Sequence, residues 1–127
     1  EPLFQSHMWD GSAVELHENV AIAEELLDRA RSHGSHRASR SLIPGKEHQL
    51  RQTLIALADG AELAEHEAPG EATLHVLSGR VGLTADGETT DLRAGDLAQI
   101  PLTRHSLRAQ ADTVLLLTAI PREFEGE

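Results

Sequence analysis

The sequence GAELAEHEAPGEATLHVLSG, residues 60–79, is followed after a short hairpin by GDLAQIPLTRHSL, residues 95–107. Each segment begins with a glycine and carries a histidine, His66 in the first and His105 in the second. A Pro-Gly pair follows His66, and Pro101 precedes the second histidine. Glycine and proline at these points are turn signals that separate short extended runs. The two segments therefore predict a series of short β-strands.

Strand-like runs continue on both sides of these segments. Alternation with a period of two begins at Gln49 and reaches Leu57, after which Asp59-Gly60 predicts a turn. Further turns are predicted at residues 85–88 and 94–96. Many short strands with regular turns favour a sandwich or barrel over a parallel sheet. The expected strands are 49–57, 61–66, 72–78, 80–85, 88–92, 96–100, 104–109 and 112–120.

The last of these strands is nearly all apolar from Val114 to Ile120. A strand of this kind is covered on both faces, by the core on one side and by a helix or second subunit on the other. We therefore expect a homodimer, which would also protect the sheet edges.

The segment before the strands predicts a helix and a loop. Residues 19–33 have apolar side chains at helical spacing, with Asn19 as the N-cap and Gly34 as a left-handed stop. A helix of this length needs the barrel or a partner chain to pack against. The following stretch RSHGSHRASRS, residues 31–41, predicts a loop. We interpret it as a solvated basic segment, with an anion-binding patch as the alternative.

Composition limits the function. A chain of 127 residues predicts one domain with a modest core. The net charge of −10 and the three aromatic residues Phe4, Trp9 and Phe124 argue against a nucleic-acid partner, which needs basic and stacking side chains. No run is long and apolar enough for a membrane span. The absence of cysteine fits a cytoplasmic protein.

The chain is divided by its composition into four parts. Residues 1–8 look like the remnant of a cleavable tag and a start methionine, so Glu1–His7 are left out of the site analysis. Residues 9–45 form the expected helix and loop extension, 46–122 the barrel, and 123–127 an acidic tail.

The first segment resembles the first conserved motif of the cupins, small jelly-roll barrels that often hold a metal. Gly60, His66 and Gly79 stand at the family's spacing. The positions of the motif's second histidine and its glutamate hold Ala68 and Ala72 instead. The resemblance implies an all-β fold, a double-stranded β-helix (jelly-roll) cupin barrel with an N-terminal helical extension, and a reduced set of metal ligands.

The second segment resembles the second cupin motif. Gly95 and Pro101 match it, Thr103 takes a glycine position, and His105 comes one residue early. Together the two motifs cover more than half of the chain, and their scaffold positions are specific only in combination. Of the four ligands that the resemblance implies, His66 and His105 are present.

The expected site is a pocket inside the barrel lined by Gln52, His66 and His105. A divalent iron, manganese, nickel or zinc ion usually needs three or more protein ligands. Glu71 could supply a carboxylate if its loop shifts, and Gln52 has the strand parity that we expect to face the barrel. The alternative is a metal-free pair of imidazoles that satisfy each other inside a polar pocket.

The remaining histidines are weaker candidates. His75 is opposed by strand alternation, because an inward residue 72 leaves it on the other face. His48 lies just before the first barrel strand and is more distant. His17, His33 and His36 belong to the extension and are expected in solvent.

Three functions follow as hypotheses. The first is a cupin that binds a small-molecule ligand inside the barrel without redox chemistry. The second is a metal-dependent enzyme of the dioxygenase or isomerase type that cupin resemblance implies, with His66, His105 and Glu71 around the metal. The third is a stand-alone ligand-sensing module that acts through a protein partner, since this chain forms no helix-turn-helix. The substrate cannot be derived from the fold.

Overall fold

A computed structural model describes residues 11–43, 49–68 and 70–121. The predictions for residues 1–8, His48, Pro69 and the tail 123–127 lie outside these described residues. The described elements in chain order are α1 (Asn19–Ser32), β1 (Arg37–Ile43), β2 (Arg51–Leu57), β3 (Glu62–His66), β4 (Gly70–Ser78), β5 (Arg80–Ala85), β6 (Glu88–Arg93), β7 (Leu97–Gln99), β8 (His105–Ala109) and β9 (Thr113–Pro121).

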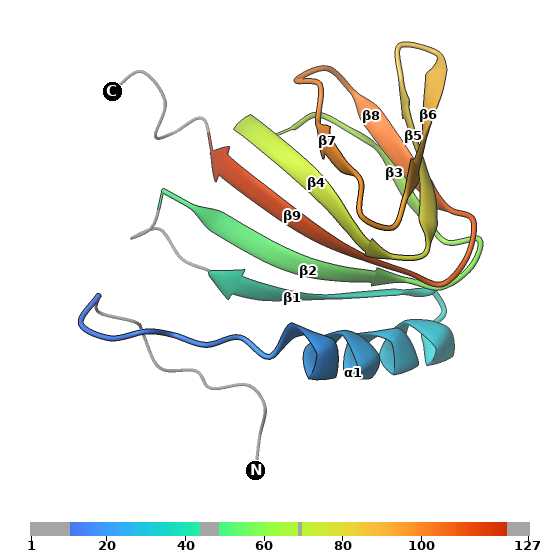
Figure 1. The fold of residues 1–127 in the computed structure, drawn as a ribbon. Coiled ribbons are helices and arrows are strands. Elements are labelled where there is room, and N and C mark those ends of the chain that lie inside the picture. The colour runs from blue at the N-terminus through green and yellow to red at the C-terminus, as the bar shows by residue number, and fades with distance from the viewer. Residues whose placement is uncertain (1–10, 44–48, 69, 122–127) are drawn as a thin grey trace.

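Two antiparallel sheets face each other, as Figure 1 shows. The first has the strand order β1-β2-β9-β4-β7 and the second the order β3-β8-β5-β6. Neighbours that are far apart in sequence, such as β2 with β9 and β3 with β8, are typical of a jelly roll. The predicted all-β jelly-roll class with an N-terminal helix is confirmed, and the strands predicted between residues 61 and 120 agree with the observed ends to within two residues.

The space between the sheets is filled by aliphatic side chains, as the scarcity of aromatic residues requires. We call the sheet faces that point into this space the inner faces. Alternate residues of each strand reach it, because successive side chains of a strand point to opposite faces. The side chains in this core with 1% exposure or less are Leu57, Leu74, Val76, Val81 and Leu115.

The loop predicted for residues 31–41 is wrong from Arg37 onward. Arg37–Ile43 form β1, which pairs antiparallel with β2 at the edge of the first sheet. Ala38, Leu42 and Ile43 pack toward the helix although Arg40 stands between them, so apolar contacts hold a strand whose sequence is mostly polar. The chain turns into β1 at His36, whose φ is 60°.

The predicted helix is confirmed, but its ends differ. Glu18 rather than Asn19 is the N-cap residue, and it makes no side-chain capping bond. At the other end His33 is extended, so the predicted left-handed stop at Gly34 is not how the helix ends. The His33 N–H instead closes the last turn on the Arg29 carbonyl oxygen. Among the described residues, no helix has both the length and the apolarity that crossing a membrane would require.

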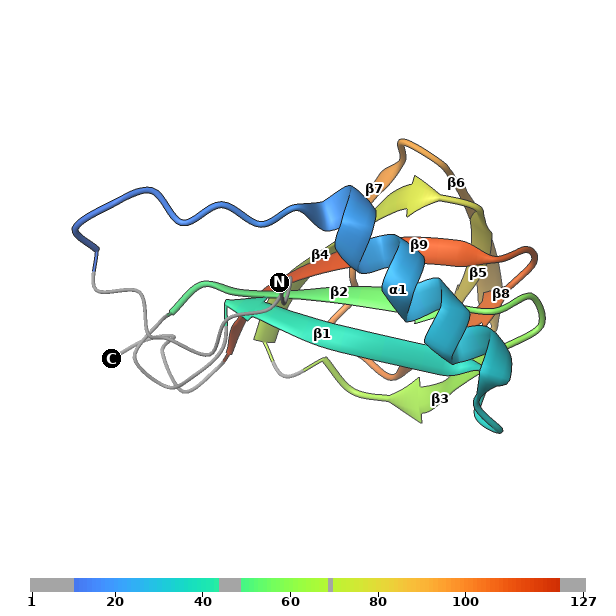
Figure 2. The same cartoon turned by 90° about the horizontal axis from the view of Figure 1, so that it is seen from below.

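Helix α1 covers the outer face of the first sheet over β1 and β2, as the turned view in Figure 2 shows. Strand β9 is therefore covered on both sides. Its inner face joins the core, while Val114 and Leu116 lie in the cluster under the helix. The sequence predicts that a helix or a second subunit covers this strand, and in the structure a helix covers it. The buried residues of this second cluster are Ile22, Leu26, Ala30, Leu42, Leu54, Ala56, Ala58 and Val114.

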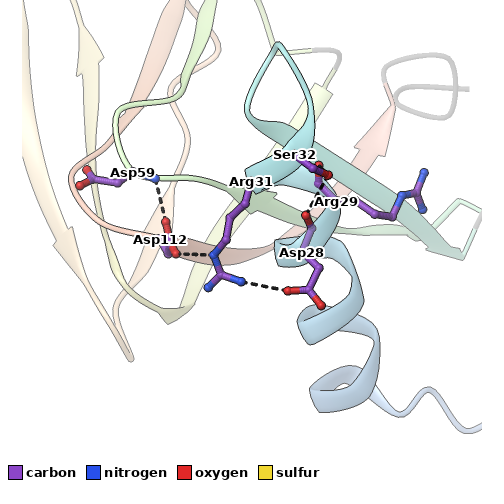
Figure 3. A network of polar contacts seen from close by, with 6 residues as sticks. All are labelled: Asp28, Arg29, Arg31, Ser32, Asp59 and Asp112. Atoms are coloured by element: carbon purple, nitrogen blue, oxygen red, sulfur yellow. Dashed lines mark hydrogen bonds and ion pairs between the residues drawn. The ribbon is translucent and has the colours of Figure 1, made fainter.

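One carboxylate ties the end of α1 to the loops beside it (Figure 3). Asp112 accepts a hydrogen bond from the Asp59 backbone N–H at 2.9 Å and another from Arg31 Nε at 2.8 Å. Arg31 also donates to Asp28, one turn earlier in the helix, at 3.1 Å. The Asp59 N–H and the Arg31 guanidinium both favour the charged carboxylate, so the pKa of Asp112 lies below its ordinary value.

We expect Asp112→Asn to lower the free energy of unfolding by about 1 kcal/mol at neutral pH, because its contact with Arg31 loses its charge. A carboxyl with a lowered folded-state pKa stabilises the fold above its ordinary pKa of about 4, and this contribution disappears as pH falls through the lowered value. The difference between the wild type and Asp112→Asn should therefore shrink toward pH 3. Urea unfolding at pH 7, 5 and 3 measures it, with Asp86→Asn in an exposed hairpin as the control. A difference that is independent of pH would contradict this role of Asp112.

Candidate functional site

The two histidines of the sequence motifs meet at one end of the second sheet. His66 on β3 lies directly opposite His105 on β8, and their ring centroids are 4.5 Å apart with the planes tilted by 58°. The register shifts between Leu63 and His66, and this irregularity places His66 on the face to which His105 belongs. His105 is 4% exposed and shares the inner face with Leu107, whereas His66 is exposed at the rim.

Both imidazoles are held by the same local contact. His66 Nδ1 lies 2.9 Å from the Ala64 carbonyl oxygen, and His105 Nδ1 lies 3.1 Å from that of Thr103. A carbonyl oxygen can only accept, so Nδ1 is the protonated nitrogen in each ring. In the neutral form each Nε2 therefore offers a lone pair, the orientation by which backbone carbonyls also fix metal-binding or proton-accepting histidines.

The two alanines of the first motif occupy buried positions. Ala68 is 4% and Ala72 is 5% exposed, and Ala72 belongs to the core between the sheets. Leu74 and Val76 point inward along the same face of β4. The positions where the cupin resemblance places an imidazole and a carboxylate are thus inward-facing or buried, and they hold methyl groups.

An arginine that the sequence analysis missed lies across from Ala72. Arg51 begins β2 in register with Ala119 of β9, and Ala119 is in turn in register with Ala72 of β4. Ile55 and Leu57 of β2 contact the core, so strand alternation places Arg51 on the inner face as well. Its side chain is half-buried, and its Nε atom is buried. An arginine therefore shares the inner face of the first sheet with Ala72, two strands away from it.

The expected inward position of Gln52 is wrong. Gln52 shares its face of β2 with Leu54 and Ala56, which pack under α1. Its amide nitrogen donates to the Thr118 hydroxyl on the neighbouring strand at 3.1 Å, on this outer face. The prediction of which β2 residues face the core is wrong because both faces of β2 carry apolar residues. Alternation alone therefore does not show which face is the inner one.

Glu71 and His75 also lie on the outer side of the first sheet. Both alternate with the inward Ala72 and Leu74, so their side chains point away from the barrel. For His75 this is the position that alternation predicts. For Glu71 it removes the carboxylate that a loop shift was expected to bring inward, because Glu71 is itself part of β4.

A recess of about 310 Å³ opens beside the histidine pair. Ala85 on β5, in register with His105, is one of its lining residues, and Leu83 is another. Its polar groups come from the β5–β6 hairpin and the end of β7. Those that can accept hydrogen bonds are Asp86, Glu88, Thr90 and Gln99.

The donor set does not fit a resident divalent metal. Two Nε2 atoms are fewer than the three or more protein ligands that such sites use. Within residues 11–43, 49–68 and 70–121, no group of three or more histidine, aspartate or glutamate side chains could hold a metal ion. The Arg51 side chain on the inner face adds no ligand, because a guanidinium has no acceptor lone pair to offer a metal ion. The site suits a ligand that brings its own negative charge and its own hydroxyl donors.

Comparison with known proteins gives two kinds of similarity. A family model described as fructose-bisphosphate aldolase class-II matches residues 1–38. The fructose-bisphosphate aldolase of Streptomyces galbus is 39% identical over 88 residues, which are 64% of this chain and 26% of the aldolase. The chain thus spans about a quarter of the length of this curated relative. This match includes Glu1–His7, and the tag remnant expected there stays a prediction.

The rest of the chain is similar to small barrel proteins. A conserved protein of unknown function from Streptococcus pyogenes, SPY1581, superposes with a TM-score of 0.63 at 29% identity, over 70% of this chain and 77% of its own. An RmlC-like cupin from Shewanella frigidimarina gives a TM-score of 0.61 at 26% identity, over 69% and 78% of the two chains. The family model of the cupin domain matches residues 53–121, from the middle of β2 to the end of β9. The motifs, the jelly roll and this match agree, and the chain belongs to the cupin domain family.

Proposed function

We propose that the barrel binds a small hydroxylated carboxylic acid and needs no metal to do so. The ligand's carboxylate would bind the Arg51 guanidinium, and its hydroxyl groups would donate to the Nε2 atoms of His66 and His105. Further hydroxyls would donate to the carboxylates of Asp86 and Glu88 in the adjoining recess. Pockets of this kind combine an apolar wall with a few convergent polar groups.

One observation carries this proposal: Arg51 faces inward in register with Ala119 and Ala72. A planar guanidinium suits a carboxylate, with which it can form two parallel charge-assisted hydrogen bonds. The tautomer of both histidines supports the second half of the proposal, because a neutral imidazole with Nδ1 bound accepts rather than donates at Nε2. An acid that carries hydroxyls satisfies both requirements.

Calorimetric titration with gluconate, hexanoate and sorbitol tests the two requirements separately. We expect gluconate to bind, while hexanoate lacks the hydroxyls and sorbitol lacks the charge. Arg51→Gln should weaken gluconate binding about tenfold or more, since a hydrogen bond to a charged group contributes about 1.5–3 kcal/mol. His66→Asn, at an exposed position, should reduce the preference for gluconate over hexanoate.

Arg93→Gln is the matched control, because Arg93 is an exposed arginine paired with Asp91 on the second sheet. Thermal melting of each variant separates loss of binding from loss of folding. Equal affinity of the wild type and Arg51→Gln for gluconate would overturn the proposal. So would purified protein with stoichiometric iron, manganese, nickel or zinc that is lost in His66→Asn.

A homodimer and a cytoplasmic location remain proposals of ours. The dimer is supported by the part of the first sheet that α1 leaves open, where Leu77 is 37% and Leu97 is 67% exposed on β4 and β7. The acidic charge of the chain supports the expectation that neither nucleic acid nor an anionic membrane is a partner.

A further inference from the structure

A second concave site lies away from the histidine pair, at the seam between the two sheets. β1 is the last strand of the first sheet and β3 the last strand of the second, so each has an edge that no strand of the described residues pairs with. A groove of about 360 Å³ crosses this seam and reaches the end of α1. It shares no lining residue with the recess beside His105.

The basic residues of the groove come from three places in the chain. Arg29 and His33 belong to the last turn of α1 and its C-cap, and Arg37 begins β1. Figure 3 shows the Arg29 side chain extending away from the contact between Arg31 and Asp112. Three cationic or protonatable groups are thus brought to one groove of a protein whose net charge is −10.

The two arginines of the groove differ from other arginines of the described chain in their partners. Five arginines elsewhere form ion pairs with carboxylates: Arg31, Arg80, Arg93, Arg104 and Arg108. Within the residues that the structure describes, no carboxylate pairs with Arg29 or Arg37. Arg37 Nη1 donates to the Glu62 backbone carbonyl at 3.0 Å, a neutral acceptor that positions the guanidinium without cancelling its charge.

Three carboxylates close to the groove contact two other arginines, which leaves them with one net negative charge. The Glu62 side chain pairs with Arg108, and Asp28 and Asp112 both pair with Arg31. The two positive charges of Arg29 and Arg37 outweigh the one net negative charge of these neighbours. Electrostatics alone would thus favour a negatively charged occupant here.

The remaining lining residues indicate the size and chemistry of that occupant. Ser39 and Thr53 supply hydroxyl groups from the inner faces of β1 and β2, where hydroxyls can donate to oxyanion oxygens. Ile55 and Leu63 supply apolar surface that belongs to the edge of the core. A bare ion would leave this apolar surface wet, whereas a small organic body would cover it.

We propose that the seam groove binds a small organic oxyanion, a phosphate monoester or a carboxylate with an apolar part, between Arg29 and Arg37. The oxyanion lies between the two guanidinium groups, which can each offer paired N–H donors to it.

Nuclear magnetic resonance titration of the full chain tests this site with three probes: inorganic phosphate, phenyl phosphate and benzoate. Saturable shifts at residues 29–39 are expected with phenyl phosphate or benzoate, and weaker ones with inorganic phosphate. Phenyl phosphate and benzoate together tell whether phosphate or carboxylate is preferred. The double variant Arg29→Gln, Arg37→Gln should bind at least tenfold more weakly, and higher salt should weaken the wild type.

Arg93→Gln is the matched control, since Arg93 is exposed, pairs with Asp91 and belongs to β6, at the opposite edge of the second sheet from β3. Arg51→Gln must leave these shifts intact, so failure of the proposed barrel ligand and failure of this site are told apart. Both exchanged arginines have exposed side chains, so the double variant should fold, and its melting temperature verifies this. The absence of saturable shifts with all probes, or shifts that persist in the double variant, would overturn the proposal.

Discussion

Replacing Gly79 with alanine is expected to lower the free energy of unfolding by about 4 kcal/mol. Gly79 joins β4 to β5 with a φ of +86°, where a side chain is strained. A Cβ at this position would lie 2.3 Å from the Asp112 carbonyl oxygen and 2.6 Å from the Thr113 Cα. These are backbone atoms of the last residue before β9 and the first residue of β9, so they cannot move aside as the end of a side chain could. Urea unfolding measures the loss.

Gly87→Ala is the matched control for this prediction. Gly87 also has a positive φ, +78°, but nothing lies within 4 Å of the Cβ that alanine would add. It should therefore lose only the conformational part, about 1 kcal/mol. If Gly79→Ala yields no folded protein while Gly87→Ala is stable, the prediction is met in its strongest form. Similar losses for the two variants would show that the close approach of residues 79 and 112 is not what requires glycine.

The strand pattern could be predicted because its turns are encoded locally. The hairpin between β5 and β6 illustrates this: Asp86 and Gly87 have φ values of 53° and 78°, the positive pair that a tight two-residue turn requires. Asp-Gly is the sequence signal for this geometry, and the flanking strands follow from it. Where a turn residue sets the register, the sequence alone is sufficient.

β1 could not be predicted in this way. Its sequence RASRSLI is mostly serine and arginine, and Ile43 at its end is the one β-branched residue of the kind typical of strands. The strand exists because Ala38 and Leu42 pack under α1 and because β2 offers it a partner edge. Both causes are tertiary, and a window of local sequence does not contain them.

The two histidines of the candidate site could be predicted from the sequence, but the faces to which the side chains of the site point could not. His66 and His105 follow from the motif spacing, but their meeting depends on the register shift in β3, which the sequence does not reveal. The sequence predicts Gln52 on the inner face of β2, whereas Arg51 lies there, and this difference has another cause. Both faces of β2 are covered, so its alternation is equally consistent with either residue facing inward, and only the partner strands decide.

Leu26→Ala is expected to lower the free energy of unfolding by about 3 kcal/mol, because it leaves a cavity between α1 and the first sheet. Leu26 has no exposed surface and lies in the same cluster as Leu54 and Val114. A loss of this size in one cooperative transition requires that the helix and the barrel unfold together.

Val20→Ala is the control on the same helix, since Val20 is 78% exposed and should change stability by less than about 0.5 kcal/mol. Urea unfolding followed by circular dichroism compares the variants. Equal stability of Leu26→Ala and the wild type would mean that α1 docks only loosely on the sheet. A loss of about 3 kcal/mol would instead show that α1 packs tightly on the first sheet. Removal of residues 1–45 would then take away both α1 and β1, which cover β9 and line the seam groove. The extension that precedes the cupin motifs would then be a structural part of this barrel.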